Sequence, residues 1–128
     1  MSILRTTLVG MRNGCRSAQS ALIREIENHL KPLRASAPEA FRDAGKEAAI
    51  PYLDRMFDGL CEAVLLGREE ARVDLVDTKT DDVSIEVAAN VWNDVAGFLT
   101  SHGLPCERAW RWHDEGRRSG IVVLIVQL

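Results

Sequence analysis

The segment GIVVLIVQ, residues Gly120–Gln127, is the strongest strand signal in the sequence. Every residue from Ile121 to Val126 is apolar, so neither face of a strand built from them suits water. A strand that is apolar on both faces has to be covered on both. We therefore expect this segment to be the central strand of its sheet.

A second strand is expected immediately before it, at residues 107–113, and a glycine-containing connection joins the two into a hairpin. Trp110 and Trp112 are two residues apart and share one face of this strand. Arg111 and His113 share the other face with Ala109. Residues 114–119 form the loop, where Gly116 is the residue expected to supply a positive φ.

The stretch WRWHDEGRRSG, residues 110–120, has two interpretations. In the structural one, the tryptophans lie in the core under a solvated turn whose acids and arginines neutralise one another. In the functional one, the turn is a recognition loop, because loops on rigid hairpins carry binding disproportionately and Trp and Arg are enriched at binding hot spots. The predicted binding residues are Arg111, His113, Asp114, Glu115, Arg117 and Arg118.

One segment reads as either strand or helix. Residues 83–87 alternate like a strand, yet apolar residues occupy one half of a helical wheel over residues 85–102. A period sustained over five turns outweighs an alternation over five residues, so one long helix is predicted. Asp81 or Asp82 is expected to cap its start, and Gly103 to end it.

The first half of the chain predicts helices. Residues 18–33 have apolar side chains every three or four positions, and Pro32 predicts that this helix stops near Leu30. The segment Ser36-Ala37-Pro38-Glu39 matches a capping box, which predicts a separate short helix after it. The expected packing face of that short helix consists of Ala40, Phe41, Ala44 and Ala48.

Pro51 opens a further helix, which Gly67 ends, and residues 71–77 alternate as a strand with one wet face. Residues 3–9 are a candidate short strand. We expect one α+β domain spanning residues 1–128. Its N-terminal helices pack on a small, mainly antiparallel sheet, and a strand–long helix–hairpin unit follows them. The expected buried core includes Phe57, Leu60, Trp92, Val123 and Ile125.

Charge is unevenly distributed along the 128 residues, whose net charge is −3. Residues 1–34 carry six basic and two acidic side chains, residues 35–102 six basic and fourteen acidic, and residues 103–128 four basic and three acidic. The middle region is therefore acidic and both ends are mildly basic. Solvated faces that partly neutralise each other explain this pattern most simply.

Several classes of protein are disfavoured. Three isolated cysteines, with no preceding signal peptide, fit reduced thiols in the cytoplasm. The longest apolar run is too short to span a bilayer. No zinc-ligand spacing, Walker loop, GxGxxG or GxSxG occurs, so no metal or cofactor is predicted. A Cys106–His113 pair next to an acid is the one arrangement that would favour an enzyme.

The function predicted by elimination is a small non-enzymatic protein-interaction module: an adaptor, inhibitor or regulatory subunit. In a variant, the acidic middle region mimics a nucleic acid, which rows of outward carboxylates would favour. The alternative is a nucleic-acid-binding protein that uses the basic N-terminal segment and the Arg/Trp hairpin. Arginines gathered on one patch would favour that alternative. A homodimer is also expected, through an unpaired sheet edge such as residues 3–9.

Overall fold

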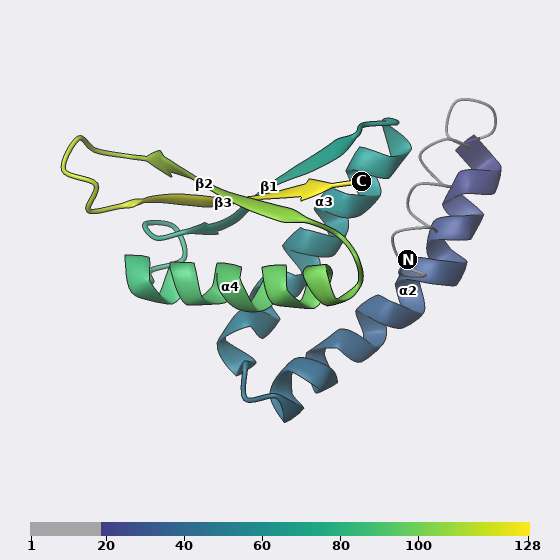
Figure 1. The fold of residues 1–128 in the computed structure, drawn as a ribbon, viewed down its shortest axis with the longest axis horizontal. Helices are drawn as coiled ribbons and strands as arrows, with labels where there is room; N and C mark the ends of the chain where they lie inside the picture. Colours follow the sequence, from purple (N-terminus) through teal and green to yellow (C-terminus); the bar gives the residue numbers. More distant parts are fainter. Residues whose placement is uncertain (1–18) are drawn as a thin grey trace.

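The computed structural model describes residues 19–128, and the candidate strand at residues 3–9 lies outside them. In this part of the chain helices come first, and a strand–helix–hairpin unit follows, so the α+β class is confirmed (Figure 1). The elements are α2 (Gln19–Asp43), the 3₁₀ helix η1 (Glu47–Tyr52), α3 (Leu53–Leu65), β1 (Glu70–Asp77), α4 (Ile85–Ser101), β2 (Cys106–Trp112) and β3 (Gly120–Gln127).

The three strands form an antiparallel sheet in the order β1-β3-β2, so β3 is central, as its composition predicts. Its alternate residues Val122, Leu124 and Val126 are fully buried in the core. Val123 and Ile125 point to the opposite face, yet they are only 5% and 6% exposed. The apolar run is therefore covered on both sides.

α3 and α4 cover one face of the sheet, which we call the inner face, and α2 packs on α3 and η1 (Figure 1). Phe57 and Leu60 of α3 have no exposed surface and anchor the core between this helix and the sheet. Trp92 of α4, also predicted to be buried, packs against the core but is only partly covered. No described helix lies on the other face of the sheet, which we call the outer face.

Residues 85–101 form one continuous helix, so the longer period correctly outweighs the local alternation. Its cap is Ser84, whose Oγ accepts the Val87 amide at 3.1 Å. The prediction of Asp81 or Asp82 as the cap is wrong, because the Asp81 carboxylate binds Arg55 instead. Gly103 adopts a φ of 82° after the helix, which is a conformation that glycine accepts without strain.

The two helices predicted before and after Pro32 are a single helix, α2, which runs through Pro32 and Pro38. Ser36 does not cap a new helix; its hydroxyl donates to the Leu33 carbonyl at 3.2 Å. A proline inside a helix removes one backbone hydrogen bond. Burial along a continuous stripe offsets that loss. The stripe is Leu30, Ala37 and Phe41, whereas Ala40, Ala44 and Ala48 of the predicted face are exposed.

Candidate functional site

The β2–β3 hairpin projects past the first turn of α4 and carries all six predicted binding residues at or near its end (Figure 1). On its inner side, Trp110 and Trp112 stack with ring centroids 4.8 Å apart and planes 6° apart. Trp110 packs against the core. Trp112 lies over Gly120, where an added Cβ would come within 2.8 Å of the indole ring. The two ends of the loop are therefore held together by a contact that only glycine permits.

The tip has a different backbone from the predicted one. Arg117, not Gly116, adopts the left-handed conformation, with a φ of 54°. Asp114 organises this turn: its carboxylate accepts the Arg118 amide at 2.9 Å, and its carbonyl accepts the Arg117 amide at 3.3 Å. The Arg117 guanidinium lies over the Trp112 ring, 5.9 Å from the centroid, and this cation–π contact offsets part of the backbone strain.

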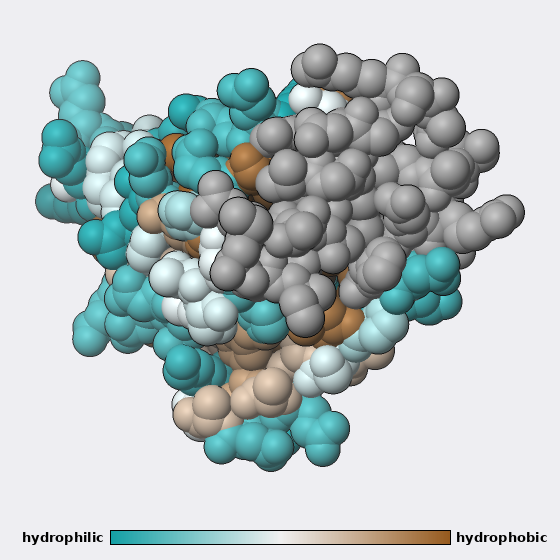
Figure 2. All heavy atoms as spheres, turned by 45° about the vertical axis from the view of Figure 1, so that its right-hand side comes forward, coloured by the Kyte–Doolittle hydropathy of each residue, from teal (hydrophilic) through white to brown (hydrophobic). Residues whose placement is uncertain are grey.

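The charges at the tip do not neutralise one another as predicted. Among the described residues, no ion pair joins Asp114 or Glu115 to either tip arginine, because the Asp114 carboxylate binds the main chain instead. Glu115, Arg117 and Arg118 are exposed. The hairpin lies at the left of Figure 2, where hydrophilic side chains stand out from the body. The tip therefore presents charged groups of both signs to solvent.

Arg111 and His113 are on the outer face, as the strand periodicity predicts; Arg111 forms an ion pair there and His113 forms a hydrogen bond. Arg111 Nη2 lies 2.7 Å from an Asp74 carboxylate oxygen, and His113 Nε2 lies 2.9 Å from Asp77 Oδ1. Both pairs link β2 to β1 across the central strand. Asp74 lies opposite Val123 in the register, so the Arg111–Asp74 pair lies on the same face of the sheet as Val123. Arg111 and His113 therefore lie apart from the other predicted binding residues, Asp114, Glu115, Arg117 and Arg118, which form the hairpin tip.

The hydrogen bond from His113 is the largest influence on Asp77 and lowers the pKa of this carboxyl to about 2. The amides of Lys79 and Thr80 and the Thr80 hydroxyl also bind Asp77 and act in the same direction. Hydrogen bonds to a carboxylate stabilise its charged form. This acid therefore stays ionised well below the usual pH range and fixes the end of β2 to the loop after β1.

Sequence reasoning missed Asp74 and Asp77 as partners of the hairpin residues. The signal was present, because alternation places Asp74 on the wet face of β1 and Arg111 on the wet face of β2. What was lacking was the strand order. Only a sheet with β3 in the middle brings these two faces within reach of a long arginine side chain.

A second polar network lies along the edge of β1 that faces away from β3. The register of β1 shifts between Asp74 and Val76, which leaves Leu75 as a bulge. Arg55 of α3 donates to the Leu75 carbonyl at 3.0 Å and makes two 2.8 Å bonds to Asp81. Asp81 also accepts the Asp77 amide. Its bonds with Arg55 lower the pKa of the Asp81 carboxyl.

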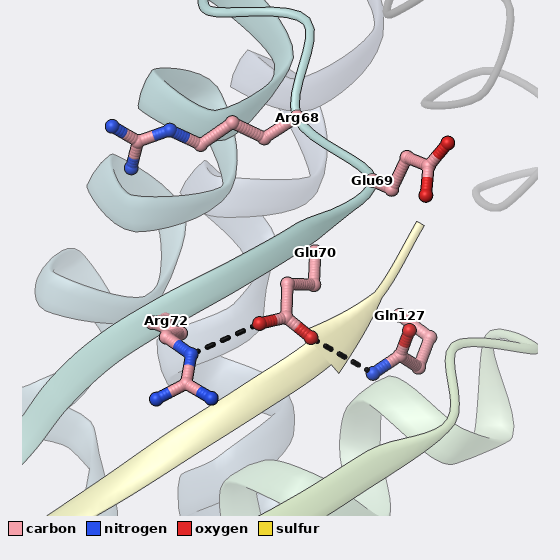
Figure 3. A pocket seen from close by; sticks show the side chains of 5 residues that line it. All are labelled: Arg68, Glu69, Glu70, Arg72 and Gln127. Carbon is pink, nitrogen blue, oxygen red and sulfur yellow. Dashed lines mark hydrogen bonds and ion pairs between the residues drawn. The ribbon is translucent and has the colours of Figure 1, made fainter.

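A shallow pocket of about 420 Å³ lies at the other end of β1. It is lined by Arg68, Glu69, Glu70, Arg72 and Gln127 (Figure 3). Glu70 accepts from Arg72 at 2.9 Å and from Gln127 at 3.3 Å, while the Arg68 side chain points away. The Glu70 carboxylate in this pocket is therefore already paired with Arg72 and Gln127.

The arrangement that would favour an enzyme is not formed. Cys106 begins β2 and His113 follows its end, and the two side chains belong to opposite faces of the strand. Burial raises the pKa of the Cys106 thiol to about 11, which disfavours the nucleophilic thiolate. Within residues 19–128, no group of three or more His, Cys, Asp or Glu side chains could hold a metal ion.

The same part of the chain contains no helix with the length and apolar character needed to cross a membrane. Comparisons of the sequence with protein-family models and with curated proteins, and of the fold with solved structures, gave no match in any of the three.

Proposed function

We propose that the protein is a small non-enzymatic protein-interaction module of the cytoplasm, an adaptor, inhibitor or regulatory subunit, that binds its partner through the hairpin tip. The observation that carries the proposal is the state of Arg117 and Arg118. Both are exposed on a stem held by the Trp110–Trp112 stack, and neither is engaged in an ion pair among the described residues. Charged groups presented on a rigid support bind at low entropic cost.

The distribution of charge favours a protein partner over a nucleic acid. Arg108 lies over the Trp92 ring on the inner face, and Arg111 is paired with Asp74 on the outer face. The four arginines of the hairpin therefore do not form one basic patch. Trp112 already stacks on Trp110 and has Arg117 against its ring, which leaves it poorly placed to stack on a base.

The variant in which acidic helices mimic a nucleic acid has less support. Asp54, Asp58 and Glu62 follow one another along α3 at intervals of four residues. Arg34 of α2 bridges the first two, at 3.0 Å and 2.8 Å, and so neutralises part of the row. A row of unpaired carboxylates would have suited a basic partner better.

The test replaces both tip arginines by alanine and compares the variant with Arg42→Ala/Arg68→Ala, which removes the same charge from exposed positions elsewhere. Each protein carries a photo-cross-linker at Gly116 and is expressed in its source cells. The parent and the control should cross-link one protein, and the tip variant should lose it. With the captured partner in hand, the tip variant should bind at least about fivefold more weakly, or ~1 kcal/mol.

Both variants should keep the free energy of unfolding within ~0.5 kcal/mol of the parent, as for surface positions generally. Equal cross-linking by the parent and the tip variant would contradict the proposal. Fluorescence titration with a single-stranded oligonucleotide tests the alternative. Binding whose dependence on salt falls by about one slope unit per arginine removed would identify a nucleic-acid-binding protein instead.

A further inference from the structure

The outer edge of β2 is a second surface, separate from the hairpin tip. The register of β2 on β3 is regular from Cys106 to Trp112. It continues at both ends through hydrogen bonds from the Gln127 amide to the Pro105 carbonyl and from the His113 amide to the Ser119 carbonyl. In an antiparallel pair, hydrogen-bonded and non-hydrogen-bonded residues alternate. The odd-numbered residues of β2 therefore bond to β3.

The even-numbered residues direct their amides and carbonyls away from the sheet. These are Cys106, Arg108, Trp110 and Trp112. No described residue hydrogen-bonds to these groups, and β2 contains neither a proline nor a bulge. Such an edge is a template for one more strand.

The sequence of β2, CERAWRW, is complementary to itself in one antiparallel register. If a second copy pairs with a twofold axis at Ala109, Glu107 faces Arg111 of the partner and Arg111 faces its Glu107. Ala109 meets its own copy as a non-hydrogen-bonded pair, the closer type, and alanine has the small side chain that this position needs. On the inner face, Arg108 faces Trp110, a pairing that favours a cation–π contact.

Hydrogen-bond parity agrees with this register. Arg108 opposite Trp110, and Cys106 opposite Trp112, are pairs in which both residues direct their backbone groups outward. Shifting the register by two residues keeps this parity but places Glu107 opposite Ala109 or His113 and leaves no Glu107–Arg111 pair. The Arg111 side chain is 60% exposed and uses one nitrogen for Asp74, so further N–H donors remain available for a second carboxylate.

We infer that the protein forms a twofold homodimer in which β2 pairs with β2 of a second copy about Ala109, giving a continuous six-stranded sheet. The inference does not depend on the function proposed for the tip. Residues 113–119 lie beyond the paired segment, so each copy keeps its tip free. One strand from each copy makes a small interface, for which we expect a dissociation constant of about 1–100 µM.

The test exchanges charges at the proposed salt bridge. Glu107→Arg and Arg111→Glu should each weaken dimerisation at least about tenfold, because like charges then face each other across the axis. An equimolar mixture of the two variants restores both opposite-charge pairs, and its heterodimer should approach the parent affinity to within about threefold. Sedimentation equilibrium at low salt measures all three. Arg72→Glu, which makes the same change on β1, is the control and should leave dimerisation unchanged.

Restored association of the mixture is specific to the proposed register. Mixing changes no contact within either chain, so any gain in affinity comes from contacts between the two chains. Chemical denaturation of each variant verifies that it is folded. A parent that stays monomeric at millimolar concentration would overturn the inference. Dimerisation that is insensitive to either single change would also overturn it. A mixture that associates no better than its components would overturn it too. Loss of partner binding on mutation of the tip would affect none of these results.

Discussion

The two edges of the sheet are of similar length and are built in opposite ways. β1 has a bulge at Leu75, a guanidinium bound to the carbonyl of that residue, and α3 packed behind it. β2 has an unbroken register, α4 contacts it from the inner face, and no described residue hydrogen-bonds to its outward backbone groups. A bulge and a bound side chain are among the devices that keep an edge from pairing with another chain. One edge is thus closed within the chain, and the other remains able to bind.

The largest effect is expected from damage to the support behind β1. Leu60→Ala removes a side chain with no exposed surface from the α3 face that packs on the sheet, and should cost ~2–5 kcal/mol of unfolding free energy. Leu66→Ala is the matched control: Leu66 is 56% exposed at the end of the same helix and should cost under ~0.5 kcal/mol. Urea denaturation measures both. Similar losses would show that the core does not depend on this face.

The next largest effect is expected at the β1 edge. Asp81→Ala removes the acceptor of two Arg55 bonds and of the Asp77 amide. We expect a loss of ~1–3 kcal/mol, since Arg55 and the Asp77 amide lose an acceptor whose side chain is only 11% exposed. The Asp77 amide should also exchange faster with deuterium. Asp43→Ala, at an exposed position, should change neither quantity.

The His113–Asp77 contact links the two edges, and acid should break it. The pKa of Asp77 is lowered from 3.8 to about 2 in the folded chain, so its contribution to stability is complete above pH 3.8 and is lost as the pH falls toward 2. Carboxyl NMR titration should give a midpoint near 2 for Asp77. His113→Ala should move that midpoint upward. An unchanged midpoint would show that the loop amides alone hold the charge.

The smallest effect concerns the other link across β3. The Arg111 and Asp74 side chains are 60% and 55% exposed, and ion pairs of this kind are screened by water and salt. A double-mutant cycle with alanine at both positions should give a coupling below ~1 kcal/mol that shrinks as salt is added. A salt-independent coupling above ~2 kcal/mol would mean that this pair, and not the burial of β3, holds the outer face together.

The parts of the fold that the sequence predicts well are those governed by one repeated pattern. The apolar run of β3 requires cover on both faces, and the helical period of α4 is long enough to outweigh the alternation at residues 83–87. The errors fall where a local signal competes with a contact distant in sequence. Pro32 and Pro38 indicate helix ends, but burial of Leu30 and Phe41 along one stripe keeps α2 continuous.

In the candidate site, too, the repeated pattern is predicted correctly and the contacts between distant residues are not. Alternation correctly assigns Arg111 and the tryptophans to opposite faces of β2. It cannot identify Asp74 and Asp77 as partners, because they belong to a strand separated from β2 by the whole of α4. It also cannot show that Asp114 binds the Arg118 amide, which determines that Arg117 and not Gly116 carries the positive φ.

The contact between Trp112 and Gly120 has a consequence for how this protein can change during evolution. A slip of one residue in the hairpin would put Ser119 or Ile121 beneath the indole, where the Gly120 position leaves no room for a side chain. The Trp112–Gly120 contact therefore fixes the register of β2 on β3 independently of the turn sequence. Residues 115–118 can vary in sequence, and even in number, while the fold is inherited unchanged. A lineage could in this way acquire a new partner by altering a few codons at the tip.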